Sequence, residues 1–67
     1  EESLFIARLL TSLPEPEREV FTLHVLGGLR LAEIARATDT PSATVRWRFA
    51  SARKLLKKAL DGTDLST

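Results

Sequence analysis

Apolar residues recur at three- and four-residue spacing along most of the chain, and no segment alternates with the strict period of a β-strand. This pattern predicts an all-α fold, a small four-helix domain. The four helices are expected over about residues 3–12, 14–26, 31–38 and 42–60.

Prolines and glycines set the ends of the first two predicted helices. Pro14 and Pro16 stop the first helix, and because proline is tolerated in a first helical turn, they can also open the second. Gly27 and Gly28 close the second helix, since glycine adopts the left-handed C-cap conformation at little cost.

A tight turn separates a short third helix from a long fourth one. Asp39 tolerates left-handed geometry, Pro41 blocks continuation of the third helix, and Ser42 is the expected N-cap of the fourth. Gly62 is a plausible C-cap or tail residue. We therefore expect a folded domain over residues 1–61 and a flexible C-terminal tail over residues 62–67.

Each predicted helix carries an apolar face, and the fourth helix has a sharply different opposite face. The residues expected on the apolar faces are Leu4, Phe5, Ala7, Leu9 and Leu10; Val20, Phe21, Leu23, Val25 and Leu26; Leu31, Ile34 and Ala35; and Val45, Phe49, Ala52 and Leu56 with Ala59 and Leu60. The outward face of the fourth helix holds Arg46, Trp47, Ala50, Ser51, Lys54, Lys57 and Lys58, with Arg53 nearer the flank.

Charge is distributed unevenly along the chain. The net charge is only +1, yet residues 1–33 hold six acids and three bases, whereas residues 34–60 hold seven bases and one acid. Lysine and arginine decorate most solvated helix faces, but this concentration in one segment suggests a surface that meets polyanions.

Size and composition exclude several classes of protein. A chain of 67 residues forms one domain with a thin core, so a large enclosed substrate cavity is not expected. The absence of cysteine excludes disulfides and zinc–thiolate sites, which leaves the cytoplasm as the expected compartment. No stretch is apolar enough to span a membrane, and the acidic N-terminal residues are unlike the basic start of a signal peptide. The missing initiator Met suggests a fragment of a longer protein.

No catalytic, metal or cofactor site is predicted. His24 has no partner at metal-ligand spacing, so we expect a half-buried helix residue. The serines and threonines lack a histidine–aspartate arrangement, and Gly27-Gly28 is too short for a phosphate loop. A basic amphipathic helix can bind membranes, but here its apolar face is needed for the core.

A short helix, a tight turn and a longer helix form the geometry that seats the second helix in the major groove of DNA. Ala35 lets the two helices approach, and Ile34 and Val45 are expected to bury apolar contacts between them. The candidate DNA contacts are Ser42, Ala43, Thr44, Arg46, Trp47, Arg48, Ser51, Arg53 and Lys54.

Two of these candidates carry alternative interpretations. Arg48, on the flank, can bond a phosphate or close an ion pair within the domain. Trp47 can lie along its own helix or against a partner chain, where an exposed ring is a suitable hot spot. It can equally touch a thymine methyl or the sugar–phosphate wall.

Residues 10–60 resemble region four of bacterial sigma factors, most closely the extracytoplasmic-function group. The resemblance rests on Leu13-Pro14-Glu15, Arg18-Glu19-Val20-Phe21, Gly28-Leu29, Ala32-Glu33-Ile34-Ala35, Pro41, Thr44-Val45-Arg46, Arg48 and Ala52-Arg53. It implies recognition of the upstream (minus-thirty-five) promoter element, docking on the flap of the RNA polymerase β subunit, and sequestration by an anti-sigma factor.

Two alternatives stay open beside this one. The domain can act chiefly as a protein-interaction module bound by an anti-sigma factor or the polymerase flap, with weak intrinsic DNA binding. It can also be the output domain of a response-regulator type activator, although the Leu-Pro-Glu opening and the Ala-Arg pair favour sigma factors.

The chain departs from the family pattern on the surface expected to face DNA. Trp47 replaces a small polar residue, and Ala50 and Ser51 replace an aromatic or histidine position and a basic one. Asp39 stands where the turn usually has glycine, Thr40 where it has an apolar residue, and Arg30 where a Ser or Thr caps the third helix. The resemblance therefore does not carry the promoter sequence of a typical member over to this chain.

Overall fold

The computed structural model describes residues 2–64, which form helices joined by short turns and include no strand. The elements are α1 (Glu2–Thr11), α2 (Glu15–Phe21), η1 (Thr22–Leu26), α3 (Leu31–Ala37) and α4 (Ser42–Asp64). Because η1 continues α2 as a π-helix, the described chain contains four helical rods. The predicted all-α four-helix domain with a long last helix is confirmed.

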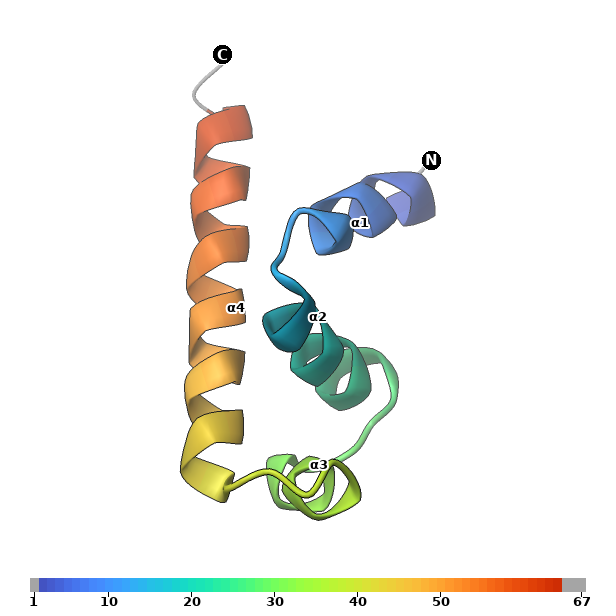
Figure 1. The fold of residues 1–67 in the computed structure, drawn as a ribbon. Helices are drawn as coiled ribbons and strands as arrows, with labels where there is room; N and C mark the ends of the chain where they lie inside the picture. The colour runs from blue at the N-terminus through green and yellow to red at the C-terminus, as the bar shows by residue number, and fades with distance from the viewer. Residues whose placement is uncertain (1, 65–67) are drawn as a thin grey trace.

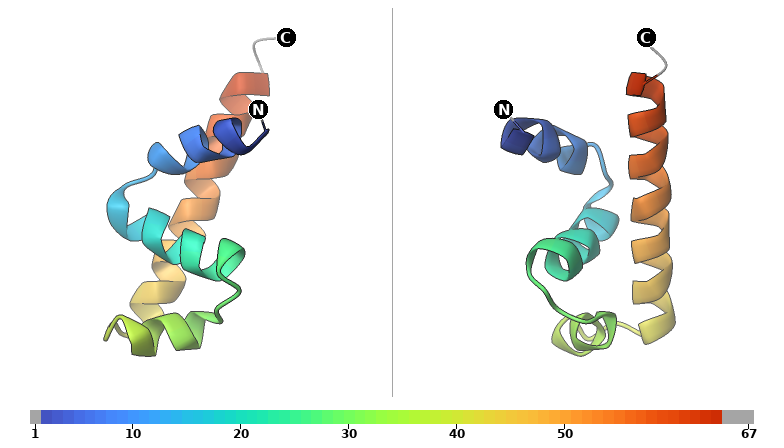
Figure 2. Two further views of the ribbon diagram at one scale, coloured as in Figure 1. Left: turned by 90° about the vertical axis from the view of Figure 1, so that its right-hand side faces the viewer. Right: turned by 180° about the vertical axis from the view of Figure 1, so that it is seen from behind.

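α4 forms one side of the molecule, and the other helices lie along its opposite side (Figure 1). From the C-terminal end of α4 toward its N-terminal end, its neighbours are α1, then α2, then α3, and the two further views show the same order (Figure 2). The most extensive contact of α4 is with α2. The N-terminal end of α4 is therefore held beside α3, at the foot of the molecule in Figure 1.

Proline forms the junction between α1 and α2, as predicted. Pro14 has φ −56° and ψ 151° and occupies the N-cap position of α2, while Pro16 lies in the first turn. The N–H of Arg18 donates to the Pro14 carbonyl at 2.9 Å, which closes that turn. Leu13, only 3% exposed, anchors the junction in the interior.

The last turn of the second predicted helix is wider than an α-helix. In η1 the N–H of Gly27 donates to the Thr22 carbonyl, five residues back, at 3.0 Å. Gly28 then takes φ +75°, and the N–H of Leu29 closes on the Leu23 carbonyl at 3.1 Å. The glycine pair ends the helix as predicted, but the π turn was not foreseen.

The core lies where α2, α3 and α4 meet. It consists of the buried Val20, Ile34, Ala35 and Val45, packed against the partly buried Leu23, Leu29, Leu31 and Phe49. These residues belong to the predicted apolar faces, except Leu29, which lies in the turn between η1 and α3.

Four predicted apolar-face residues of the second and first helices are exposed. Val25 is 50% and Leu26 63% exposed. Both lie in η1, whose wider π turn does not keep the α-helical period used for the prediction, so the prediction for this pair was wrong. On α1, Leu4 and Ala7 are also exposed, while Leu9 and Leu10 are half-buried; the side chain of Phe5 lies outside the described residues.

α4 begins one position differently from the prediction. The N–H of Val45 donates to the Pro41 carbonyl at 3.1 Å, so Pro41 occupies the N-cap position and Ser42 is the first helical residue. The predicted Ser42 cap is wrong, because the Pro41 carbonyl is already the acceptor for the first turn of the helix.

α4 also ends later than predicted. It continues through Gly62 to Asp64, so residues 62–64 of the expected flexible tail are helical, and Gly62 is not a C-cap. One glycine in a helix costs only about 1 kcal/mol relative to alanine, which a long helix can absorb. Residues 65–67, the rest of that predicted tail, lie outside the described residues. Despite its length α4 is too polar to cross a membrane, and none of the described helices meets that requirement.

Candidate nucleic-acid interface

The turn between α3 and α4 is fixed by backbone geometry and by threonine hydroxyls. Asp39 adopts φ +52°, the left-handed conformation predicted for it. The N–H of Thr40 donates to the Ala35 carbonyl at 2.9 Å, and the Thr38 hydroxyl donates to the Ile34 carbonyl at 2.7 Å. The departures from the family turn therefore still give a closed, hydrogen-bonded turn.

Apolar contacts fix the angle between α3 and α4. Ile34 and Val45 are both 0% exposed, and Ala35 is 6% exposed, as predicted for a helix-turn-helix pair. α3 begins at a backbone cap, since the Arg30 N–H donates to the Glu33 carboxylate at 2.7 Å. Because both helices are anchored in the core, the first turns of α4 are held outward in one orientation.

The predicted contact residues fall into two groups by exposure. Six side chains are exposed: Ser42, Ala43, Arg46, Trp47, Arg53 and Lys54. Three are half-buried: Thr44, Arg48 and Ser51. The structure thus presents most of the predicted surface to solvent along one side of α4.

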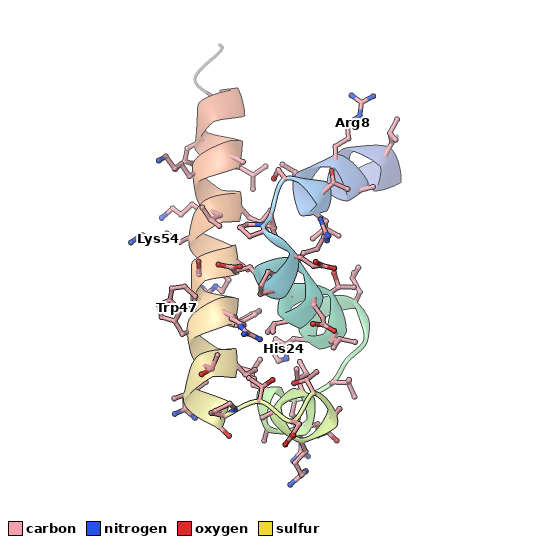
Figure 3. All side chains as sticks on the ribbon, viewed as in Figure 1. Arg8, His24, Trp47 and Lys54 are labelled. Carbon is pink, nitrogen blue, oxygen red and sulfur yellow. The ribbon has the colours of Figure 1, made fainter. Side chains whose placement is uncertain are left out.

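Trp47 stands out from α4 on the side away from α2, and Lys54 projects from the same side (Figure 3). The ring is 64% exposed, so it is not part of the core. Trp47, Ala50, Ser51 and Lys54 line a shallow hollow on this surface. A second hollow beside it is lined by Ala50, Arg53, Lys54 and Lys57.

Arg48 faces the opposite edge of α4, toward α2. It is half-buried and lines an open hollow together with Glu15, Arg18 and Glu19. The flank position expected from the sequence is therefore observed. Two carboxylates and a second guanidinium share this hollow with Arg48, so both interpretations of this side chain stay open.

Ser51 lies at the edge of the outward face: its side chain is half-buried, although it still lines the hollow beside Trp47. Its hydroxyl donates to the Glu17 carboxylate at 3.2 Å, which joins α4 to α2. Glu17 is only 8% exposed although it is charged. The helical wheel did not predict this bond. Ser51 lies at the boundary between the inward and outward faces of α4, where packing against α2 determines whether a side chain is buried.

Glu17 is the residue that sequence reasoning overlooked. It is one of two acids in the first turn of α2, where a negative charge also suits the helix N-terminus. Its spacing of three from Val20 and seven from His24 places it on the same buried side of α2, and that spacing was the available signal.

Aromatic contacts support the same α2–α4 junction. The rings of Phe21 and Phe49 stack with centroids 5.9 Å apart, and the His24 ring meets Phe49 edge-on at 4.7 Å. His24 Nδ1 donates to the Leu29 carbonyl at 2.6 Å, so the predicted half-buried structural histidine is confirmed. The Arg53 guanidinium lies 5.8 Å from the Phe49 centroid, which draws this side chain toward the domain.

The arrangement contains the elements of a DNA-binding motif, a short helix, a tight turn and a longer helix. Among the described residues, no group of three or more His, Cys, Asp or Glu side chains could hold a metal ion.

A protein-family model described as "Sigma-70, region 4" matches residues 6–56. The chain belongs to this family. No curated protein and no solved structure matches it.

Sigma-70 region 4 is a DNA-binding domain of sigma factors, and the match includes α3, the turn and the first part of α4. The region is a regulatory, non-catalytic part of its sigma factor, and its family partners are promoter DNA and RNA polymerase. The match ends within α4, at residue 56, so the basic residues Lys57 and Lys58 lie beyond the part that matches the family.

Proposed function

We propose that this region 4 domain serves a sigma factor of the extracytoplasmic-function group. It recognises the upstream (minus-thirty-five) promoter element, docks on the flap of the RNA polymerase β subunit, and works in the cytoplasm. The observation that carries the DNA-reading part is the exposed, basic N-terminal half of α4, held outward by the buried Ile34 and Val45.

Arg46 is the proposed base-reading residue. It is exposed one turn into α4, where recognition helices contact base edges, and its guanidinium can bond guanine bidentately. Lys57 lies eleven residues further on, about 16 Å along the helix axis. Because the N-terminal residues of a recognition helix contact the base edges, a residue this far along the helix is placed for phosphate contact and not for the bases beside Arg46.

The test is a titration of the whole chain against a randomised duplex pool, at low and moderate salt, followed by sequencing of the bound duplexes. Arg46→Ala should cost about 1–3 kcal/mol and relax the preference at one base position. Lys57→Ala, the matched control, should weaken all sequences alike and reduce the salt slope by about one. Equal loss on every sequence from Arg46→Ala would contradict the base-reading role.

The second candidate is a protein-interaction module, bound by an anti-sigma factor or the flap and binding DNA only weakly. Two large exposed apolar side chains favour it, Trp47 at 64% and Leu26 at 63%. If binding in the same titration stays weak and blind to sequence while the β flap or an anti-sigma factor binds the chain, this candidate replaces the first. The family match already favours a sigma factor over a response-regulator output domain.

A further inference from the structure

Trp47 occupies an unusual chemical environment on the outward side of α4. Its neighbours on that side at helical spacing are Ala43, four residues before, and Ala50, three residues after, and both are exposed. Neither alanine has a hydrogen-bonding side chain. Ser51, which shares the hollow, has its hydroxyl directed to the Glu17 carboxylate at 3.2 Å.

The neighbours of the ring on its own helix face thus offer apolar contact, and Lys54 adds one positive charge to the hollow. In the major groove, the base edges offer donors, acceptors and one apolar feature, the C5-methyl group of thymine. Arg46, next to Trp47, supplies the charged contact, and Lys54, two turns further on the same side, lies about 10 Å along the axis where a phosphate can meet it.

We propose that Trp47 is a specificity-determining residue that reads a thymine methyl beside the base pair read by Arg46. The inference rests on the proposed DNA-binding function. It adds to that function the identity of the base that Trp47 contacts. The element bound by this chain then contains a thymine whose methyl packs on the indole ring, with Lys54 holding a flanking phosphate of the same site.

The experiment replaces thymine by deoxyuridine, which removes only the methyl group. The duplex enriched by the unaltered 67-residue chain is synthesised again as a series, in which each thymine in turn is replaced by deoxyuridine. Dissociation constants of every duplex are then measured for the unaltered chain and for Trp47→Ala. At one thymine the replacement should weaken the unaltered chain about fourfold, since burying a methyl-sized group is worth about 0.8 kcal/mol. The same replacement should leave the affinity of Trp47→Ala unchanged.

Leu26→Ala is the matched control, because Leu26 is 63% exposed and lies on η1 rather than on the outward side of α4. It should retain the full fourfold methyl effect. The chain holds one tryptophan, so the intrinsic fluorescence of Trp47 reports contact directly and should change less on the deoxyuridine duplex.

The outcomes separate the inference from the function beneath it. If the chain binds a specific sequence but Trp47→Ala responds to the loss of each thymine methyl as the unaltered chain does, the inference is overturned and promoter reading stands. Binding without any sequence preference overturns both. Unchanged affinity of Trp47→Ala for every duplex, with lost binding to a protein partner, assigns the ring to that partner and also overturns the inference.

Discussion

Asp39 shows how one residue can satisfy a turn that usually takes glycine. The backbone there needs a left-handed conformation, φ +52°, which costs most L-residues roughly 1–2 kcal/mol. Aspartate and asparagine tolerate it better because their short polar side chains bond locally. The turn closes with the Thr40 N–H on the Ala35 carbonyl, so the residue type at position 39 affects how α4 is presented.

Substitutions at this position test the role of the left-handed backbone. Asp39→Val should lower the free energy of unfolding by about 1–2 kcal/mol, because a β-branched side chain is a poor fit to φ +52°. Asp39→Asn is the matched control, since it removes the charge and keeps the tolerance. Urea denaturation of both variants gives the comparison, and equal stability of the two would show that the turn is not strained.

At the scale of elements, the α2–α4 contact determines which side chains of α4 remain available. Glu17 and Ser51 join the two helices by a hydrogen bond, and Phe49 packs between Phe21 and His24. This contact engages the Ser51 hydroxyl with Glu17, and the Arg53 guanidinium lies 5.8 Å from the Phe49 centroid. The surface left to meet DNA is therefore narrower than the basic face of the isolated helix.

Removal of the Ser51 hydroxyl should expose the cost of the buried Glu17 carboxylate. Ser51→Ala is expected to lower the free energy of unfolding by about 1–3 kcal/mol, even though alanine is the better helix former. In the double variant Ser51→Ala with Glu17→Leu, the loss should be smaller, because both polar groups leave together. Thermal and urea unfolding give the stability of the single and the double variant. A Ser51→Ala variant as stable as the parent chain would show that the Ser51–Glu17 hydrogen bond does not stabilise the fold.

At the scale of the whole molecule, a small core supports a long helix. The domain measures 42 × 21 × 16 Å, and the fully buried side chains of largest volume are only Ile34 and Val45 among the described residues. At roughly 0.05–0.15 kcal/mol per residue, the total stability is about 3–10 kcal/mol. The same two residues set the angle of the helix-turn-helix, so folding and DNA presentation depend on one cluster.

Graded truncation of Ile34 tests this dependence. Ile34→Val should cost about 0.5–1.5 kcal/mol and keep a cooperative transition, whereas Ile34→Ala should cost about 2–5 kcal/mol and remove much of the stability. Leu26→Ala, a truncation at a 63% exposed site, should stay within about 0.5 kcal/mol of the parent chain. Similar losses from Ile34→Ala and Leu26→Ala, compared by circular dichroism melting, would contradict a core centred on Ile34.

The helices, the turn residues and the contacts at the centre of the motif could all be predicted from the amino-acid sequence. Apolar spacing placed Ile34, Ala35 and Val45 together, and proline and glycine marked most helix ends, because these signals act within one turn of the chain. The candidate contacts Arg46 and Trp47 followed from the same spacing, and both are exposed.

Which side of each helix is covered by another helix became clear from the packing of the folded domain. Leu26 and Ser51 lie near or beyond the edges of their predicted faces, and the neighbouring element left one in solvent and drew the other to Glu17. The π turn of η1 and the extension of α4 past Gly62 also depend on more than local preference. The physical reason is that burial and hydrogen bonding at a face boundary are settled by the partner surface, which a helical period does not contain.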